Sequence, residues 1–303
     1  MLVGGIMKVE IVGAGAVGLM LGSFLLSKGM DVTFVVRNER QLQEINEKGI
    51  AVQTLEGEVA WFKNAQASLT LSARRSLVIV STKYEHLESI WPMLIDCPND
   101  CEFLFVQNGL AHYEEGLKQP LNNVSYGSAQ FGAQKIDAVT VAQRGIGILK
   151  LANGKGDCSF SRKLLQLSDE TMPIEWQEDA FSMLFEKALL NCFINPITAI
   201  LQVPNGQLIK NGQAFTLLEH LYEELMRAFP QYRKRFPFEA VRSLCEKTSQ
   251  NTSSMLADRL AGRRMEVETI VGEVIRLARK GGCEVPVLTT LYHLVKSLDS
   301  KGE

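Results

Sequence analysis

The fold is decided near the start of the chain by the stretch KVEIVGAGAVG, which occupies residues 8–18. Its first five residues form a short apolar run with strand character, and the glycine pattern G-x-G-x-x-G follows at once. Residues 19–26 continue with helical character, and a second apolar run follows at residues 32–36. Residues 7–37 therefore predict a strand, a helix and a parallel second strand.

Each glycine of this first turn meets a different requirement of dinucleotide binding. Gly13 permits a tight turn, Gly15 lets the backbone approach a pyrophosphate, and Gly18 lets the helix pack closely on the strand. The helix N-terminus favours the anionic phosphates. The alternative is an ordinary glycine-rich turn, but the flanking strands favour cofactor binding by the whole turn, that is by Gly13, Ala14, Gly15, Ala16, Val17 and Gly18.

The end of the second strand indicates which nicotinamide dinucleotide binds. An acidic residue there would accept hydrogen bonds from a ribose 2′-hydroxyl, whereas an arginine would pair with a 2′-phosphate. Arg37 occupies this position, while Asp31 begins the strand and so lies at the opposite edge of the sheet. The sequence therefore predicts NADP(H), and the alternative is that Arg37 is a solvated loop cation.

Strands and helices continue to alternate through the N-terminal part of the chain. Apolar runs at residues 77–80 and 102–106 flank a predicted helix over 84–94, which is typical of a Rossmann-type doubly wound sheet. Glycine-punctuated, alternating segments over 124–151, such as Val139-Thr140-Val141, predict antiparallel strands that extend this sheet.

Beyond Trp176 the pattern becomes almost entirely helical. Apolar periodicity predicts helices over 179–194, 214–229, 238–249 and 266–280. We therefore expect an α/β chain with an NADP-binding Rossmann-type domain over residues 1–178 and an all-helical substrate-binding and catalytic domain over 179–303. Residues 1–6 precede the first strand, and we expect them to have little structural role.

Composition and charge exclude several other classes of protein. With 46% apolar and 22% charged residues, the chain has the composition of a soluble globular protein. A net charge of −2 gives no general attraction to nucleic acid or anionic lipid. We find neither a signal peptide nor a membrane-length apolar run, so we expect a cytoplasmic protein without membrane or nucleic-acid partners. The six cysteines lack the spacing of a zinc site, so we expect reduced thiols and no metal.

Two groups of polar residues are candidates for the site. Two strand-end motifs, Ser81-Thr82-Lys83 and Gln107-Asn108-Gly109, follow predicted strands, and ligands of such sheets bind outside the carboxyl ends of the strands, so Lys83 and Asn108 are placed to face a ligand. Lys187, Asn191 and Asn195 are spaced by four residues within a largely apolar helix, so each step drifts by only about 40° and all three share one face. That face is either solvated or the lining of a wet cleft, and the apolar residues between favour the cleft.

Taken together, these motifs resemble the ketopantoate reductase (2-dehydropantoate 2-reductase) family over nearly the whole chain. The resemblance includes the glycine turn, Arg37, both strand-end motifs and the Lys187 helix, followed by PITA at 196–199, Asn205-Gly206, SSMLAD at 253–258 and GRRME at 262–266. It implies reduction of a 2-oxo acid with NADPH, giving pantoate for pantothenate and coenzyme A synthesis. A homodimer is the oligomeric state we consider for such an enzyme.

The resemblance also implies a role for each matched residue. Lys187 corresponds to the general acid, and Glu266 to an essential active-site carboxylate that also contacts the cofactor. The implied substrate-binding residues are Asn108, Asn191, Asn195, Asn205 and Ser254. Lys83 is expected to contact the cofactor, and Asn108 is expected to contact both cofactor and substrate. His86 departs from the family pattern, and we expect it on a helix surface rather than as a proton donor.

Two other functions stay open at this stage. A related NADP-dependent enzyme could reduce another 2-oxo acid or form an opine-type secondary amine. A regulatory protein could sense NADP(H) without turnover, although such a sensor has no chemical need for both Lys187 and Glu266.

Overall fold

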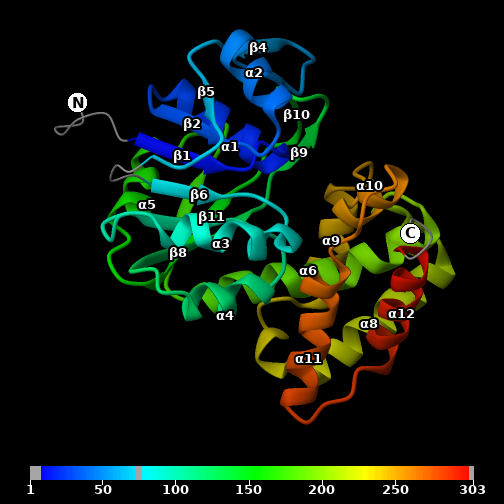
Figure 1. Cartoon of the computed structure of the whole chain (residues 1–303). Coiled ribbons are helices and arrows are strands. Elements are labelled where there is room, and N and C mark those ends of the chain that lie inside the picture. Colours follow the sequence, from blue (N-terminus) through cyan, green and yellow to red (C-terminus); the bar gives the residue numbers. More distant parts are fainter. Residues whose placement is uncertain (1–7, 73–76, 300–303) are drawn as a thin grey trace. The chain divides into compact units, whose positions relative to one another are not determined.

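The computed structural model describes residues 8–72 and 77–299, and the expectation for residues 1–6 lies outside them. The chain divides into two compact units, one of Met1–Gln107 with His112–Met183 and one of Asn108–Ala111 with Leu184–Glu303 (Figure 1). The short segment 108–111 thus belongs with the helical unit, although it follows a strand of the other. The predicted domain boundary between residues 178 and 179 stays a prediction.

The first unit is built on an eight-stranded sheet with the order β12-β11-β8-β7-β6-β1-β2-β5. Its strands are β1 (Lys8–Val12), β2 (Asp31–Val35), β5 (Gln66–Ser68), β6 (Leu77–Val80), β7 (Glu102–Phe105), β8 (Asn123–Ala129), β11 (Leu149–Lys155) and β12 (Ile174–Gln177). All neighbours run parallel except β8 and β11, which are antiparallel. This confirms the predicted fold class, including its antiparallel extension.

Helices pack on both faces of this sheet (Figure 1). Leu104 belongs to the apolar cluster that includes α1 (Ala16–Ser27), whereas the next residue, Phe105, packs against Trp91 of α3 (Leu87–Ile95). Because successive strand residues point to opposite faces, α1 and α3 lie on opposite sides of the sheet. The other helical segments of this unit are α2 (Glu39–Lys48), η1 (Tyr84–His86), α4 (Ala111–Lys118), α5 (Ser159–Lys163) and η2 (Leu164–Leu167).

A separate four-stranded sheet, β4-β3-β10-β9, was not predicted. Its strands are β3 (Ile50–Gln53), β4 (Val59–Phe62), β9 (Gly132–Lys135) and β10 (Thr140–Gly145). The expectation that Val139-Thr140-Val141 extends the main sheet was therefore wrong. Helix α1 contacts strands of both sheets, and Val141 is fully buried in the same apolar cluster as α1. Alternation of apolar residues indicates which face of a strand is buried, but not which sheet the strand joins.

The second unit is helical, as predicted. Its helices are α6 (Ala180–Leu201), α7 (Gln207–Lys210), α8 (Gly212–Ala228), η3 (Pro230–Tyr232), α9 (Phe238–Lys247), α10 (Ser254–Leu260), η4 (Glu268–Gly272), α11 (Glu273–Lys280) and α12 (Pro286–Asp299). By length and composition α6 could cross a membrane, but 72% of its apolar window is buried inside the structure, as in a core helix. It runs past the predicted end at residue 194 and through Pro196, where the Thr198 hydroxyl donates to the carbonyls of Ile194 and Asn195.

Candidate active site

The turn between β1 and α1 requires glycine at two positions, Gly13 and Gly18, because a side chain at either would collide with neighbouring atoms. Gly13 adopts a φ of +102°, and a Cβ there would lie 2.9 Å from Cγ2 of Thr82. A Cβ on Gly18 would lie 2.0 Å from the carbonyl oxygen of Gly13, so glycine is needed for the close approach of helix and strand. By contrast, among the described residues only Gly15 itself, its chain neighbours and the adjoining helix backbone can approach within 4 Å of the Cβ position of Gly15, the N-cap of α1. The backbone N–H groups of this helix end are therefore accessible to an anion.

The residues between these glycines complete the turn. The carbonyl oxygen of Ala14 accepts hydrogen bonds from Gln41 Nε2 at 3.0 Å and from Lys135 Nζ at 2.9 Å, and Ala16 and Val17 begin α1. Burial lowers the pKa of Lys135. Lys135 brings a cation to the glycine turn from β9, and sequence reasoning missed it because the second sheet was not predicted.

The strand ends next to this turn carry further polar groups. Ser81 Oγ donates to the carbonyl oxygen of Gly13 at 2.8 Å, and Lys83 follows at the start of η1. Gln107 is only 5% exposed, and neither polar atom of its side-chain amide has a hydrogen-bond partner among the residues described. A buried amide in this state is costly, so Gln107 joins the candidates for ligand contact. The expected surface position of His86 is observed, with 37% of its side chain exposed.

Arg37 lies just past the end of β2 and is exposed. Within residues 8–72 and 77–299, its guanidinium makes no hydrogen bond or ion pair. The neighbouring Asn38 caps α2 by accepting the backbone N–H groups of Arg40 and Gln41. Asp31 is the first residue of β2 and lies at the other edge of the sheet, as the sequence predicts. The arginine is therefore available to a phosphate at the carboxyl end of β2.

In the helical unit, a single amide joins the two predicted catalytic side chains. Lys187 Nζ donates to Oδ1 of Asn108 at 2.7 Å, and Nδ2 of Asn108 donates to Oε2 of Glu266 at 3.2 Å. Burial lowers the pKa of Lys187 from its ordinary 10.5 to about 8, while the negative charge of Glu266 opposes this shift. The ammonium group is therefore a much stronger acid than that of an ordinary lysine.

The backbone beside Asn108 holds this arrangement in place. Leu110 N–H donates to the carbonyl oxygen of Thr269 at 2.9 Å, and a Cβ on Gly109 would lie 2.2 Å from that same oxygen. Thr269 belongs to η4, a π-helical turn that begins two residues after Glu266. The loop that carries Asn108 thus packs backbone to backbone on the turn that follows Glu266. Such π-turns are frequent at functional sites.

The remaining predicted substrate residues also lie in the helical unit. Asn195 is 4% exposed, and its Nδ2 donates to Oγ of Ser254 at 3.4 Å, which connects α6 with α10. Asn191 lies on α6 one turn before Asn195 and is partly exposed. Asn205 is 8% exposed and follows α6. Among the described residues, no hydrogen bond joins Asn191 or Asn205 to the Lys187 cluster.

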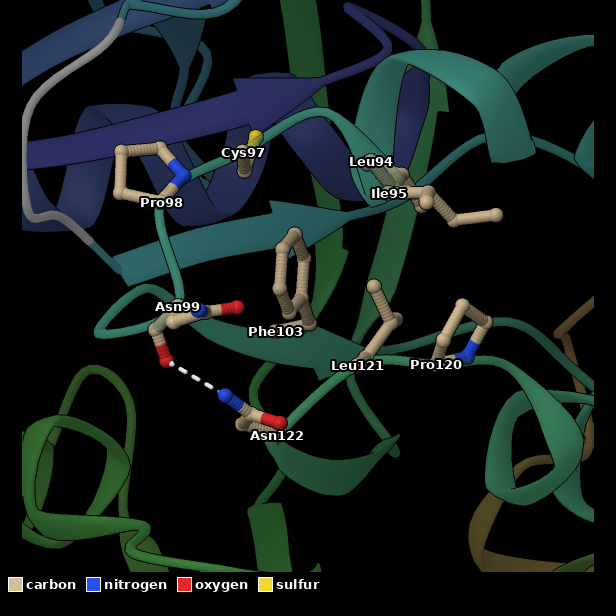
Figure 2. Close-up of a pocket in the computed structure, with 9 residues that line it drawn as sticks. All are labelled: Leu94, Ile95, Cys97, Pro98, Asn99, Phe103, Pro120, Leu121 and Asn122. Atoms are coloured by element: carbon tan, nitrogen blue, oxygen red, sulfur yellow. Dashed lines mark hydrogen bonds between the residues drawn. The ribbon is translucent and has the colours of Figure 1, made fainter.

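One cavity of the first unit lies at the opposite end of the strands. It measures about 10 Å³ and is lined by Cys97, Phe103, Leu121 and their neighbours, with Asn122 Nδ2 donating to the carbonyl oxygen of Asn99 at 3.2 Å (Figure 2). This volume has room for about one water molecule. Since it adjoins the amino end of β7, it is not where ligands of a parallel sheet bind.

A Rossmann-type sheet followed by a helical unit that carries a partly buried lysine of lowered pKa is the architecture of a class of two-domain oxidoreductases. Residues 9–156 match the family model of ketopantoate reductase PanE/ApbA, and residues 179–299 match the model of its C-terminal part. The chain therefore belongs to the ketopantoate reductase family of oxidoreductases, which confirms the resemblance.

Individual relatives agree with this assignment. The 2-dehydropantoate 2-reductase of Listeria monocytogenes is 30% identical over 304 residues, covering 98% of each chain. The crystal structure of the probable 2-dehydropantoate 2-reductase of Bacillus subtilis superposes with a TM-score of 0.85 at 28% identity, covering 96% of this chain and 100% of that one. A D-mandelate dehydrogenase, solved with NADH and anilino(oxo)acetate, shares the fold with a TM-score of 0.85 at 24% identity, covering 98% and 99%.

Proposed function

We propose that this protein reduces 2-dehydropantoate (ketopantoate) to pantoate with NADPH, in the synthesis of pantothenate and coenzyme A. The observation that carries the proposal is the hydrogen-bonded chain from Lys187 through Asn108 to Glu266. It places a lysine of lowered pKa next to an amide and a carboxylate, in a family of 2-oxo acid reductases.

The residues of the first unit fit a dinucleotide phosphate. The open backbone above Gly15 and the uncapped start of α1 suit a pyrophosphate, and the exposed guanidinium of Arg37 suits a 2′-phosphate. Lys135 adds positive charge beside Ala14. We propose that Lys83, Asn108 and Glu266 also contact the cofactor.

In the proposed reaction the bound NADPH supplies the hydride, and the protein manages the charge that builds on the substrate oxygen. Lys187 stabilises this oxygen and donates a proton from Nζ to it. Glu266 favours the protonated lysine, and Asn108 fixes the direction of the ammonium group. Asn191, Asn195, Asn205 and Ser254 hold the carboxylate and hydroxyl of the substrate without adding a competing charge.

A second candidate is the reduction of another 2-oxo acid. It is favoured by the shared fold with a D-mandelate dehydrogenase that was solved with anilino(oxo)acetate. We further propose that the protein is a cytoplasmic enzyme with an NADP-binding domain over residues 1–178 and a helical substrate-binding and catalytic domain over 179–303. Limited proteolysis that cuts first near residue 178 would support this division.

The test is NADPH consumption with ketopantoate and, in parallel, with phenylglyoxylate and pyruvate. We expect the highest kcat/KM for ketopantoate. Lys187→Ala should lower kcat by about 10²–10⁴-fold with little change in NADPH affinity, whereas a Lys187→Arg variant with nearly full kcat would remove the proton-donor role. A preference for phenylglyoxylate would favour the second candidate, and no turnover of any oxo acid would refute both.

A further inference from the structure

Asn205 is held more firmly than a substrate contact alone would require. The backbone N–H of Asn205 donates to the carbonyl oxygen of Asn251 at 3.1 Å. The backbone N–H of Gly206 donates to the carbonyl oxygen of Ser249, also at 3.1 Å. A Cβ on Gly206 would lie 2.6 Å from Cβ of Ser249. The segment that carries Asn205 is therefore fixed against the turn that follows α9.

Thr248, in the same turn, determines which way the Asn205 amide points. The Thr248 hydroxyl donates to the carbonyl oxygen of Leu244 at 2.7 Å, and Nδ2 of Asn205 lies 3.0 Å from Oγ1 of Thr248. A hydroxyl has one proton, and that of Thr248 is committed to Leu244, so its oxygen can only accept. Rotating the Asn205 amide by 180° would bring two acceptors together, so Nδ2 must face Thr248.

The consequence is an acceptor of fixed orientation. Oδ1 of Asn205 is buried and has no hydrogen-bond partner within the described part of the chain. An amide oxygen can be satisfied only by a donor, which excludes a carboxylate or oxo group as its ligand. A substrate hydroxyl supplies such a donor, and its absence would leave the oxygen desolvated and unpaired.

We propose that Thr248 is a positioning residue that presents Oδ1 of Asn205 as the acceptor for the hydroxyl group of a hydroxylated 2-oxo acid. This inference rests on the proposed function, in which Asn205 binds the substrate. It makes Thr248 responsible for discrimination between hydroxylated and deoxy substrates, although Thr248 itself does not touch the substrate.

The test compares ketopantoate with 3,3-dimethyl-2-oxobutanoate, which is the same oxo acid without the hydroxyl. Thr248→Val keeps the shape of the side chain and removes the hydroxyl, so the Asn205 amide is free to rotate. We expect KM for ketopantoate to rise about tenfold with kcat nearly unchanged, and KM for the deoxy acid to stay constant. Thr248→Ser, which keeps the hydroxyl, should retain the wild-type ratio of the two kcat/KM values.

Thr289→Val serves as the matched control, because the Thr289 hydroxyl on α12 is buried without a hydrogen-bond partner in the described structure. It should leave the ratio unchanged. The inference is overturned if Thr248→Val keeps the wild-type ratio, if both acids lose activity equally, or if Thr289→Val has the same effect. A wild-type enzyme that reduces both acids equally well would overturn the inference alone. One that reduces neither would refute the proposed function and the inference with it.

Discussion

Glu266→Gln tests the electrostatics of Lys187 directly, because it removes a charge and nearly keeps the shape of the side chain. The Asn108 amide accepts a hydrogen bond of 2.7 Å from the Lys187 ammonium and donates one of 3.2 Å to the Glu266 carboxylate. These two hydrogen bonds keep the two charged groups within roughly 8 Å of each other. At an effective dielectric constant of about 20, two unit charges at this distance attract by about 2 kcal/mol, which corresponds to about 1.5 pH units. Since Glu266 raises the pKa of Lys187, its loss should lower that pKa further from about 8.

The assay is the pH dependence of kcat for NADPH oxidation with ketopantoate. Lys187 can donate a proton only when it is protonated, so the wild-type kcat should fall as the pH rises through about 8. In Glu266→Gln this fall should move to lower pH by about 1 to 1.5 units. Oxidation of pantoate needs the neutral amine, so its rate should instead rise with pH.

Glu284→Gln is a suitable control for this experiment, because the Glu284 side chain is 78% exposed and pairs with Arg279 on the surface. Its pH profile should match that of the wild type. If kcat of Glu266→Gln fell at the same alkaline pH as kcat of the wild type, Glu266 would not set the pKa of Lys187, and the charge argument would be refuted.

Arg37→Ala should reduce the preference for NADPH over NADH by about ten- to a hundredfold in kcat/KM, and an unchanged ratio would mean that another group holds the 2′-phosphate. Asn195→Ala and Ser254→Ala should each raise KM for the oxo acid with little change in the Kd of NADPH, and the opposite result would assign them to the cofactor. Lys187→Met should raise the free energy of unfolding in urea at pH 7 by about 1–3 kcal/mol. Because the pKa of Lys187 is lowered from 10.5 to about 8 on folding, the unfolded chain binds more protons than the folded chain between pH 8 and 10.5. The wild-type free energy of unfolding therefore rises with pH over that window, and the stability advantage of Lys187→Met should shrink. A gain that is constant with pH would contradict this linkage.

The parallel sheet could be predicted because its signals are local. The glycine turn and the apolar runs of β1, β2 and β6 each lie within a few consecutive residues. The second sheet gave no such signal, since its strand β4 is mostly exposed, with Val59 and Trp61 exposed by 52% and 49%. In a strand that is exposed on most positions, apolar residues no longer indicate a buried face.

The candidate site could be predicted as a set of residues but not as an arrangement. Asn108 and Glu266 are separated by 158 positions, and their hydrogen bond depends on the packing of Gly109 against the backbone of Thr269. No periodicity encodes that contact. Lys135 and Thr248 were missed for a related reason, because each acts through a tertiary neighbour rather than through a sequence motif.

The side-chain amides of Asn108 and Asn205, both in the helical unit, are oriented by the same physical rule. An ammonium can only donate and a carboxylate can only accept, so Lys187 and Glu266 leave Asn108 a single orientation. For Asn205, the committed hydroxyl of Thr248 has the same effect. Neutral amides of fixed orientation distinguish donors from acceptors without the desolvation cost of a further buried charge. In the proposed reaction, this lets one site hold an acceptor, the oxo group, and a donor, the hydroxyl, while the cation of the Lys187 side chain protonates the product.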